Sequence, residues 1–266
     1  MSTTGYALMT DREVPDHLAR LWRLPVDAKL GRPAALDVDR VVATAVELAD
    51  RDGLAAATLP KIAAALRVTP MSLYRHIGSK DELLVLMADA GMGAPPELPS
   101  GSWRSLLRAW ALAQLDVHRA RPWLTQLPIT GPPNGPNTVA WMDAGLRAVR
   151  ETSLDWPAKV GAIMVVSGYV REAFVTARQL EHAMAAADLD PAGALHDYSR
   201  NLRALVDRER LPDMAALLAS GLFDAIEPAE AEPDSDFAFG LDLILDGVAA
   251  TIAAATRSSG CGSTYR

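Results

Sequence analysis

The sequence predicts an all-α fold, with a small helical domain near the N-terminus and a larger helical bundle after it. Three observations support this prediction. Apolar residues recur at three- and four-residue steps over most of 37–256. No stretch of useful length alternates like a half-buried strand, and there is no internal repeat. Breakers such as Asp52-Gly53 and capping residues such as Thr69 separate the short helices.

Length and composition limit the class of protein. The chain has 266 residues, of which half are apolar, 22% are charged and one is cysteine (Cys261). These values predict one or two folded domains and exclude a wholly disordered chain, a disulfide framework and a cysteine-based metal cage. Apolar stretches such as 160–170 read as too short or too interrupted to span a bilayer, and no secretion signal is visible. We therefore expect a cytoplasmic protein without a membrane segment.

Breaks in the periodicity divide the chain into regions. Residues 1–30 read as a partly ordered extension, and residues 31–92 contain short helices. A Pro- and Gly-rich junction at 93–101 separates them from long helical patterns over 102–256, and 257–266 reads as a disordered tail.

The long helices predict a bundle. The stripe expected to face inward in 155–187 contains Val160, Ile163, Met164, Ser167, Arg171 and Phe174. In 235–256 it contains Phe237, Leu241, Ile244, Leu245, Val248 and Ile252. Both helices also carry apolar residues off the stripe, such as Val165 and Leu243. A helix that is apolar around much of its circumference needs a second partner, which predicts a subunit interface.

The segment 37–91 reads as four short helices. The first covers 38–51 and ends at Gly53, which supplies a left-handed C-cap. Thr58 is the expected N-cap of the second, and Thr69 that of the third, which runs through 70–76. Ser79 and Glu82 have the spacing of a capping box for the fourth.

The second and third of these helices have helix-turn-helix spacing. The third begins with compact residues, which suits entry into a major groove about 12 Å wide. Residues 55–80 contain four basic and no acidic residues, whereas 92–266 contain 15 basic and 21 acidic ones. A basic segment on an acidic body predicts a face that binds a polyanion such as DNA. The alternative from spacing alone is a small helical subdomain with solvated charges.

At these residues the sequence resembles the tetracycline-repressor (TetR) family. The resemblance covers about 50 residues, 36–84 with short gaps, and includes the run Thr69-Pro70-Met71-Ser72-Leu73-Tyr74-Arg75-His76. The segment 236–242 is similar to the last helix of the tetracycline-repressor-type C-terminal domain. The resemblance implies an all-α homodimer whose N-terminal domains bind an inverted-repeat operator. It also implies that the C-terminal domain dimerises and binds a small molecule that releases the DNA.

Carried over by position, the family's DNA contacts fall on the third helix and its flanks. Tyr74 and Lys80 would hold phosphates, whereas Ser72 and Met71 would face base edges. The full set of candidate DNA-binding residues is Arg32, Thr58, Lys61, Thr69, Pro70, Met71, Ser72, Tyr74, Arg75, His76 and Lys80.

Two departures from the family pattern affect this set. Pro60 stands where many members place a polar, base-contacting residue, so no base contact is expected there. Arg67 replaces the glycine usual in the turn and must either adopt an unusual backbone angle or change the turn. Upstream, Arg32 lies on a short basic arm that could reach a minor groove or be an ordinary tail.

No catalytic motif is visible. The five histidines show no metal-ligand spacing, and neither a phosphate-binding glycine loop nor a Gly-x-Ser-x-Gly elbow occurs. The sequence therefore predicts neither an enzyme, a resident metal nor a cofactor.

Polar residues within apolar stripes of the second half suggest a ligand pocket, which needs apolar walls and a few orienting donors. Arg171 would suit an acidic or phenolic ligand. The alternative is that the aromatic residues are core and that His118 and Arg171 extend to the surface. The candidates are Trp110, Gln114, His118, Trp141, Met142, Met164, Ser167 and Arg171.

Two hypotheses follow. The first is a dimeric transcriptional repressor that binds a palindromic operator and is released by a small-molecule effector. The second is a helical protein that sequesters a ligand or partner, in which DNA binding is ligand-independent or absent. Operator binding distinguishes them.

Overall fold

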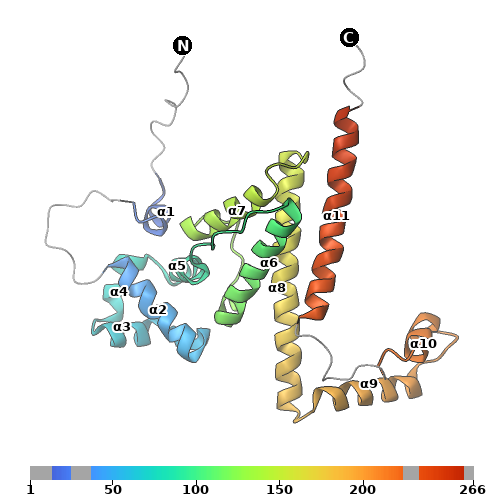
Figure 1. Cartoon of the computed structure of the whole chain (residues 1–266). Coiled ribbons are helices and arrows are strands. Elements are labelled where there is room, and N and C mark those ends of the chain that lie inside the picture. Colours follow the sequence, from blue (N-terminus) through green and yellow to red (C-terminus); the bar gives the residue numbers. More distant parts are fainter. Residues whose placement is uncertain (1–13, 25–36, 224–233, 261–266) are drawn as a thin grey trace. The chain divides into compact units, whose positions relative to one another are not determined.

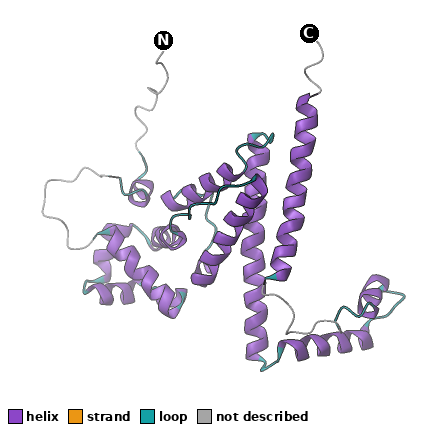
Figure 2. Ribbon diagram, viewed as in Figure 1, coloured by secondary structure: helices purple, strands orange, loops and turns teal. Residues whose placement is uncertain are grey.

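The computed structural model describes residues 14–24, 37–223 and 234–260, and every regular element in these ranges is a helix (Figure 1 and Figure 2). The all-α prediction is confirmed. Arg32 and Cys261 lie outside the described residues. The helices are α1 (Asp16–Leu21), α2 (Val38–Asp52), η1 (Leu54–Ala56), α3 (Leu59–Leu66), α4 (Pro70–Ile77), α5 (Lys80–Met92), α6 (Trp103–Ala120), η2 (Pro122–Gln126), α7 (Pro136–Ala148), α8 (Trp156–Ala186), α9 (Pro191–Leu205), α10 (Pro212–Ala219) and α11 (Ser235–Gly260).

Residues up to Ile163 form one compact unit, and α2 is the centre of its N-terminal core. This helix begins at Asp37, whose carboxylate accepts a hydrogen bond from the Arg40 N–H at 2.8 Å. It packs against α3, α4 and α5. Because burial of apolar surface is the main stabilising contribution to such a core, α3 and α4 are held in fixed positions. Fully buried side chains come from all four helices: Val41, Val42, Ile62, Leu73, Ile77 and Met87.

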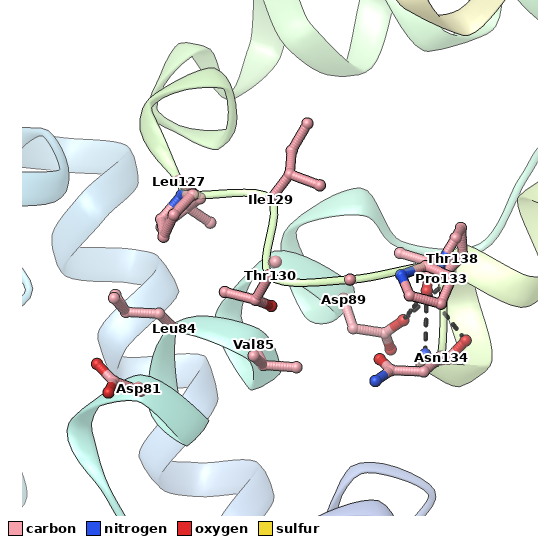
Figure 3. A pocket seen from close by; sticks show the side chains of 15 residues that line it. Asp81, Leu84, Val85, Asp89, Leu127, Ile129, Thr130, Pro133, Asn134 and Thr138 are labelled. Atoms are coloured by element: carbon pink, nitrogen blue, oxygen red, sulfur yellow. Dashed lines mark hydrogen bonds between the residues drawn. The ribbon is translucent and has the colours of Figure 1, made fainter. Parts of the chain in front are cut away.

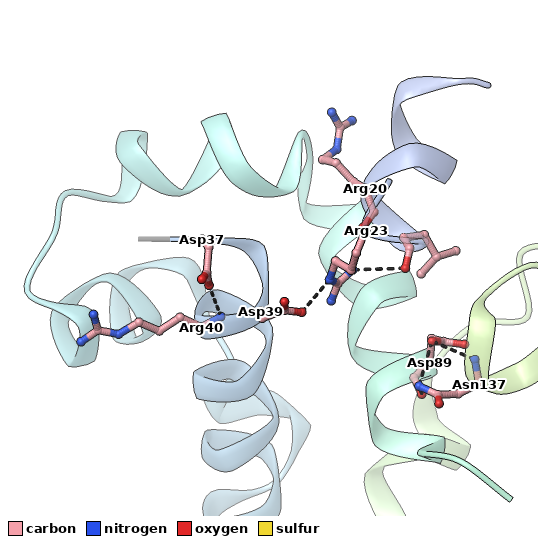
Figure 4. A network of polar contacts seen from close by, with 8 residues as sticks. Arg20, Arg23, Asp37, Asp39, Arg40, Asp89 and Asn137 are labelled. Carbon is pink, nitrogen blue, oxygen red and sulfur yellow. Dashed lines mark hydrogen bonds and ion pairs between the residues drawn. The ribbon is translucent and has the colours of Figure 1, made fainter. Parts of the chain in front are cut away.

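α5 is joined to α7 by a buried carboxylate. Asp89, with 5% of its surface exposed, accepts hydrogen bonds from two backbone N–H groups at the start of α7, those of Thr138 (2.9 Å, Figure 3) and Asn137 (3.3 Å, Figure 4). A carboxylate is favourable there because the first N–H groups of a helix have no partner within it. α6 and α7 pack with the preceding helices, so the first compact unit continues to Ile163. The domain bounds expected from the sequence, with a junction at 93–101, stay a prediction.

α1, within the N-terminal extension, docks onto the same unit. Leu21 is 3% exposed and belongs to the core around α2. Arg20 donates to Glu82 of α5 at 2.5 Å. Arg23 donates to Asp39 of α2 at 2.6 Å (Figure 4). Gly78, which lies beside the ion pair of Arg20 and Glu82, has φ 70°, a left-handed backbone angle that favours glycine. α1 therefore lies beside the junction between α4 and α5.

The second compact unit begins at Met164 and contains the rest of α8 together with α9, α10 and α11. The Tyr169 hydroxyl of α8 donates to the Phe237 carbonyl oxygen of α11 at 2.9 Å, and the two rings stack with centroids 5.4 Å apart. Burial, with a smaller contribution from the charge of Asp236, raises the pKa of Tyr169, so its hydroxyl keeps the proton it donates. These contacts join α8 to α11.

The stripe expected in α11 is correct at its buried positions, which are Phe237, Leu241, Leu245 and Val248. The stripe expected in α8 is correct at Ile163, which is 4% exposed, and wrong at Met164, which is 67% exposed. Val166 and Val170, which lie off the expected stripe, are fully buried. Apolar residues occur around most of the circumference of α8, so periodicity did not define a single buried face.

Two helices, Trp156–Ala186 and Ser235–Arg257, are long and apolar enough to cross a membrane by length and composition. Both helices are apolar over a greater length than stretches such as 160–170 led us to expect. Core helices of soluble proteins pass the same criterion.

Candidate nucleic-acid interface

The turn between α3 and α4 contains a non-glycine residue in left-handed geometry. Arg67 ends α3 with φ 58° and ψ 41°, and the next N–H, that of Val68, donates to the Ala63 carbonyl oxygen at 2.9 Å. Such backbone angles usually belong to glycine because a Cβ is disfavoured there. The unusual angle expected at Arg67 is therefore present, and the helix-turn-helix geometry is kept.

α4 has one buried face and one exposed face. Leu73 and Ile77 are fully buried against the core, as predicted. On the outer face Met71 is 73% exposed and Tyr74 is 39% exposed, while Arg75 is also exposed. The exposed Met71 and Tyr74 leave an apolar group and a hydroxyl group available to a partner.

The N-terminus of α4 presents small polar groups. Thr69 is the N-cap residue, but its hydroxyl lies 2.9 Å from the Ser72 hydroxyl and does not cap the backbone. Pro70 has no N–H and the Ser72 N–H donates to the Thr69 carbonyl oxygen at 2.9 Å, so the Met71 N–H is the one in the first turn that a side-chain cap would have served. Thr58 likewise occupies the N-cap position of α3 without a side-chain cap bond. Uncapped N–H groups with the positive end of the helix dipole favour a phosphate.

Positive charge lies next to this face. Lys61, Arg75 and Lys80 are exposed, and within the described ranges none of them forms an ion pair. The nearby Asp52 is instead bonded to Arg51 at 2.7 Å, and this hydrogen bond lowers the pKa of Asp52. His76 is half-buried and Pro70 exposed. The face therefore offers cations to a polyanion.

The predicted capping box of α5 is only half formed. Ser79 accepts a hydrogen bond from the Glu82 N–H at 3.0 Å, as expected. The Glu82 carboxylate bonds to Arg20. The Nε–H and Nη2–H groups of Arg20 both donate to Glu82 Oε2, and this distant arginine replaces the local backbone partner because charge-assisted hydrogen bonds are stronger than neutral ones.

The candidate ligand residues fall into two sets. Trp110, Gln114 and His118 are buried on α6, and the Trp110 Nε1–H donates to the Trp141 carbonyl oxygen at 2.9 Å. Met142, next to Trp141 on α7, is half-buried. A buried indole N–H needs a hydrogen-bond partner, and this bond provides one between α6 and α7. It therefore supports the alternative that the two tryptophans are core residues.

The other three candidates lie on α8 in the second unit. Met164 is exposed, and Ser167 and Arg171 are half-buried. The ligand-binding role of all eight residues stays a prediction.

A helix-turn-helix with an exposed second helix, followed by helices α6–α11, defines the class of DNA-binding transcription regulators. Residues 41–87 match the model of the bacterial regulatory proteins of the tetR family, and residues 95–252 match that of the tetracyclin repressor-like C-terminal domain. The chain belongs to the TetR family. It is a helix-turn-helix regulator and not an enzyme.

Similar proteins agree with this assignment. The chain is 33% identical over 261 residues to the HTH-type transcriptional repressor DrrR1 of Streptomyces coeruleorubidus, covering 94% of this chain and 92% of that protein. It is 32% identical over 152 residues to an HTH-type transcriptional regulator of Saccharopolyspora erythraea, covering 56% and 64%. The crystal structure of the Streptomyces coelicolor TetR family protein ActR with actinorhodin is similar, with a TM-score of 0.65, 25% identity and coverage of 83% and 99%.

Proposed function

We propose that this protein is a cytoplasmic, dimeric repressor that binds a palindromic operator through α4 and is released by a small-molecule effector. The exposed outer face of α4, anchored by the fully buried Leu73 and Ile77, is the observation on which the proposal rests. The similarity to the repressor DrrR1 over almost the whole chain supports repression as the direction of control.

The residues on this face divide by chemistry. Lys80, Arg75 and the Tyr74 hydroxyl suit phosphate oxygens, which fix position without reading sequence. Met71 and Ser72 suit base edges, because a side chain in the major groove reads methyl groups by apolar contact and bases by hydrogen bonds. Thr58, Lys61, Thr69, Pro70 and His76 flank these contacts, and Arg32 lies outside the described residues.

Exposed apolar side chains on two long helices support a dimer. Met164 (67%) and Val165 (57%) on α8, and Phe239 (68%) and Leu243 (58%) on α11, are all exposed in the single chain. A second copy of the chain would cover these faces in an isologous interface, the commonest arrangement of soluble homo-oligomers. Two α4 helices about 34–36 Å apart would then read half-sites on one face of the duplex.

An effector is supported by the family and by a structural relative. ActR, whose structure is similar to 83% of this chain, was crystallised with actinorhodin. A ligand releases DNA only if it binds the DNA-free conformation more tightly. In this chain the residues predicted to contact an effector are those of α6 and α7 in the first unit and, as a separate set, those of α8 in the second unit.

Footprinting of the DNA upstream of this gene and its neighbours tests operator binding. We expect a protected palindrome, and affinity that falls steeply with salt because binding releases counterions from phosphates. Arg75→Ala should weaken binding to all sequences and reduce the salt slope by about one. Arg210→Ala, which removes an exposed arginine of the second unit, is the matched control and should bind normally. No protection at low salt would instead favour a protein that sequesters a ligand or partner.

A further inference from the structure

A cavity of about 360 Å³ lies between α5 and the segment 127–138 that leads into α7 (Figure 3). Its floor is one face of α5, with Leu84, Val85 and Ala88, and the opposite wall contains Leu127 and Ile129. The volume falls in the range of small-molecule sites, about 300–1,000 Å³. None of the candidate ligand residues on α6, α7 and α8 lines it.

The segment over the cavity is fastened at both ends. Leu127, 7% exposed, belongs to the core around α2. At the other end Thr138 is bonded to Asp89, and the Trp22 Nε1–H donates to the Asn134 carbonyl oxygen at 2.7 Å. Pro128, Pro132 and Pro133 lie between the two anchors and line the cavity. The fixed φ angles of these prolines and the two anchors restrict the conformations open to the segment over the cavity.

The chemistry of the lining selects for an apolar cation. Ile129 is 78% exposed and its side chain points away from Leu84 and Val85 (Figure 3), so the apolar surface available to an occupant is mainly that of α5. The lining includes two carboxylates, those of Asp81 and Asp89, and no basic residue. Asp89 already accepts hydrogen bonds from α7, whereas Asp81 is exposed and forms no ion pair within the described ranges. An anionic ligand would meet no positive partner here.

We propose that this cavity binds a small apolar molecule carrying a positively charged amine, with the rings against Leu84 and Val85 and the amine at Asp81. Asp81 and Leu84 lie in the first turns of α5, which follows α4 after only Gly78 and Ser79. An occupant therefore contacts the helix that directly continues from the DNA-contacting one. If the bound amine prefers one position of α5, its binding changes the affinity of the protein for the operator. This second step rests on the proposed function.

Calorimetric titration of the full-length protein with 1-naphthylmethylamine, and with the uncharged 1-naphthylmethanol, tests the site. We expect the amine to bind more tightly. Thr130→Trp, which fills the cavity from its exposed wall, should weaken both ligands at least tenfold, whereas Gln126→Trp outside the lining should change neither. Asp81→Asn should weaken only the amine, by about two- to fivefold for a surface ion pair. Asp213→Asn, in the first turn of α10, is the charge control.

Several results would overturn the proposal. The first is that the amine does not bind at about 1 mM. The second is that Thr130→Trp still binds the amine as the wild type does. The third is that Asp81→Asn weakens the binding of amine and alcohol equally. A gel shift on the footprinted operator distinguishes amine binding in the cavity from an effect of that binding on operator affinity. We expect the amine to change the operator Kd at least threefold for the wild type but not for Thr130→Trp. Operator binding with no response to bound amine would remove only the regulatory part, whereas no operator binding at all would refute the proposed function.

Discussion

The helices around α2 and the pair α8 and α11 bury their apolar residues in different ways. In the first region Ile62, Leu73 and Ile77 are all fully buried within one chain. In the second, α8 and α11 bury one face, yet Met164 and Phe239 stay more than two-thirds exposed. The DNA-contacting region therefore completes its core alone, whereas the second region has apolar surface left over for a partner. Four substitutions test or sharpen this contrast.

The largest effect is expected inside the α2 core. Leu73→Ala removes a fully buried side chain of α4 and should lower the free energy of unfolding by about 2–5 kcal/mol, the range for buried leucines. Met71→Ala, two residues away and 73% exposed, should leave stability nearly unchanged but weaken operator binding. Urea unfolding and gel shifts measure the two effects. Equal losses of stability in both variants would contradict the conclusion that α4 has one buried and one exposed face.

The next effect concerns the exposed faces of the second region. Leu243→Glu places a charge on the 58% exposed apolar side of α11 and should raise the dimer dissociation constant at least tenfold, because a desolvated charge without a partner is costly. Light scattering coupled to size-exclusion chromatography measures the mass. Leu205→Glu on α9, 78% exposed, is the control and should remain dimeric. A dimer that tolerates Leu243→Glu would place the interface elsewhere.

A smaller effect is expected where α5 joins α7. Asp89→Asn keeps the shape but replaces one acceptor by an N–H₂ group facing the donors of Asn137 and Thr138. Unsatisfied buried donors should lower the free energy of unfolding by about 1–3 kcal/mol. Asp143→Asn on α7 breaks only an exposed pair with Arg147 and should cost under about 1 kcal/mol. Thermal unfolding of both variants decides whether the carboxylate holds the two helices together.

The same contrast shows how far the sequence could predict the structure. Periodicity and capping residues placed α2 to α5 and the buried Leu73 and Ile77, because these features are local. Contacts between distant residues left no local signal, so neither the docking of Arg20 on Glu82 nor the role of Asp89 was found. In α8 apolar residues occur on nearly every side, and the pattern did not show that Met164 faces outward. The DNA-contacting set needed the family resemblance, since spacing alone left a solvated subdomain as an alternative.

The smallest effect is expected at the turn before α4. Arg67 holds φ 58° and ψ 41°, a region that costs an L residue about 1 kcal/mol relative to glycine. Arg67→Gly removes this strain but gives the unfolded chain more conformational entropy, which offsets part of the gain. We expect the free energy of unfolding to rise by less than about 1 kcal/mol in urea titrations. Arg75→Gly, in the middle of α4, should lower it by about 0.5–1 kcal/mol because glycine is unfavourable inside a helix. Changes of opposite sign in the free energy of unfolding for these two substitutions would show that the turn is a strained connection between two well-packed helices. A loss of stability at both positions would show that the Arg67 side chain stabilises the protein by more than its backbone angle costs.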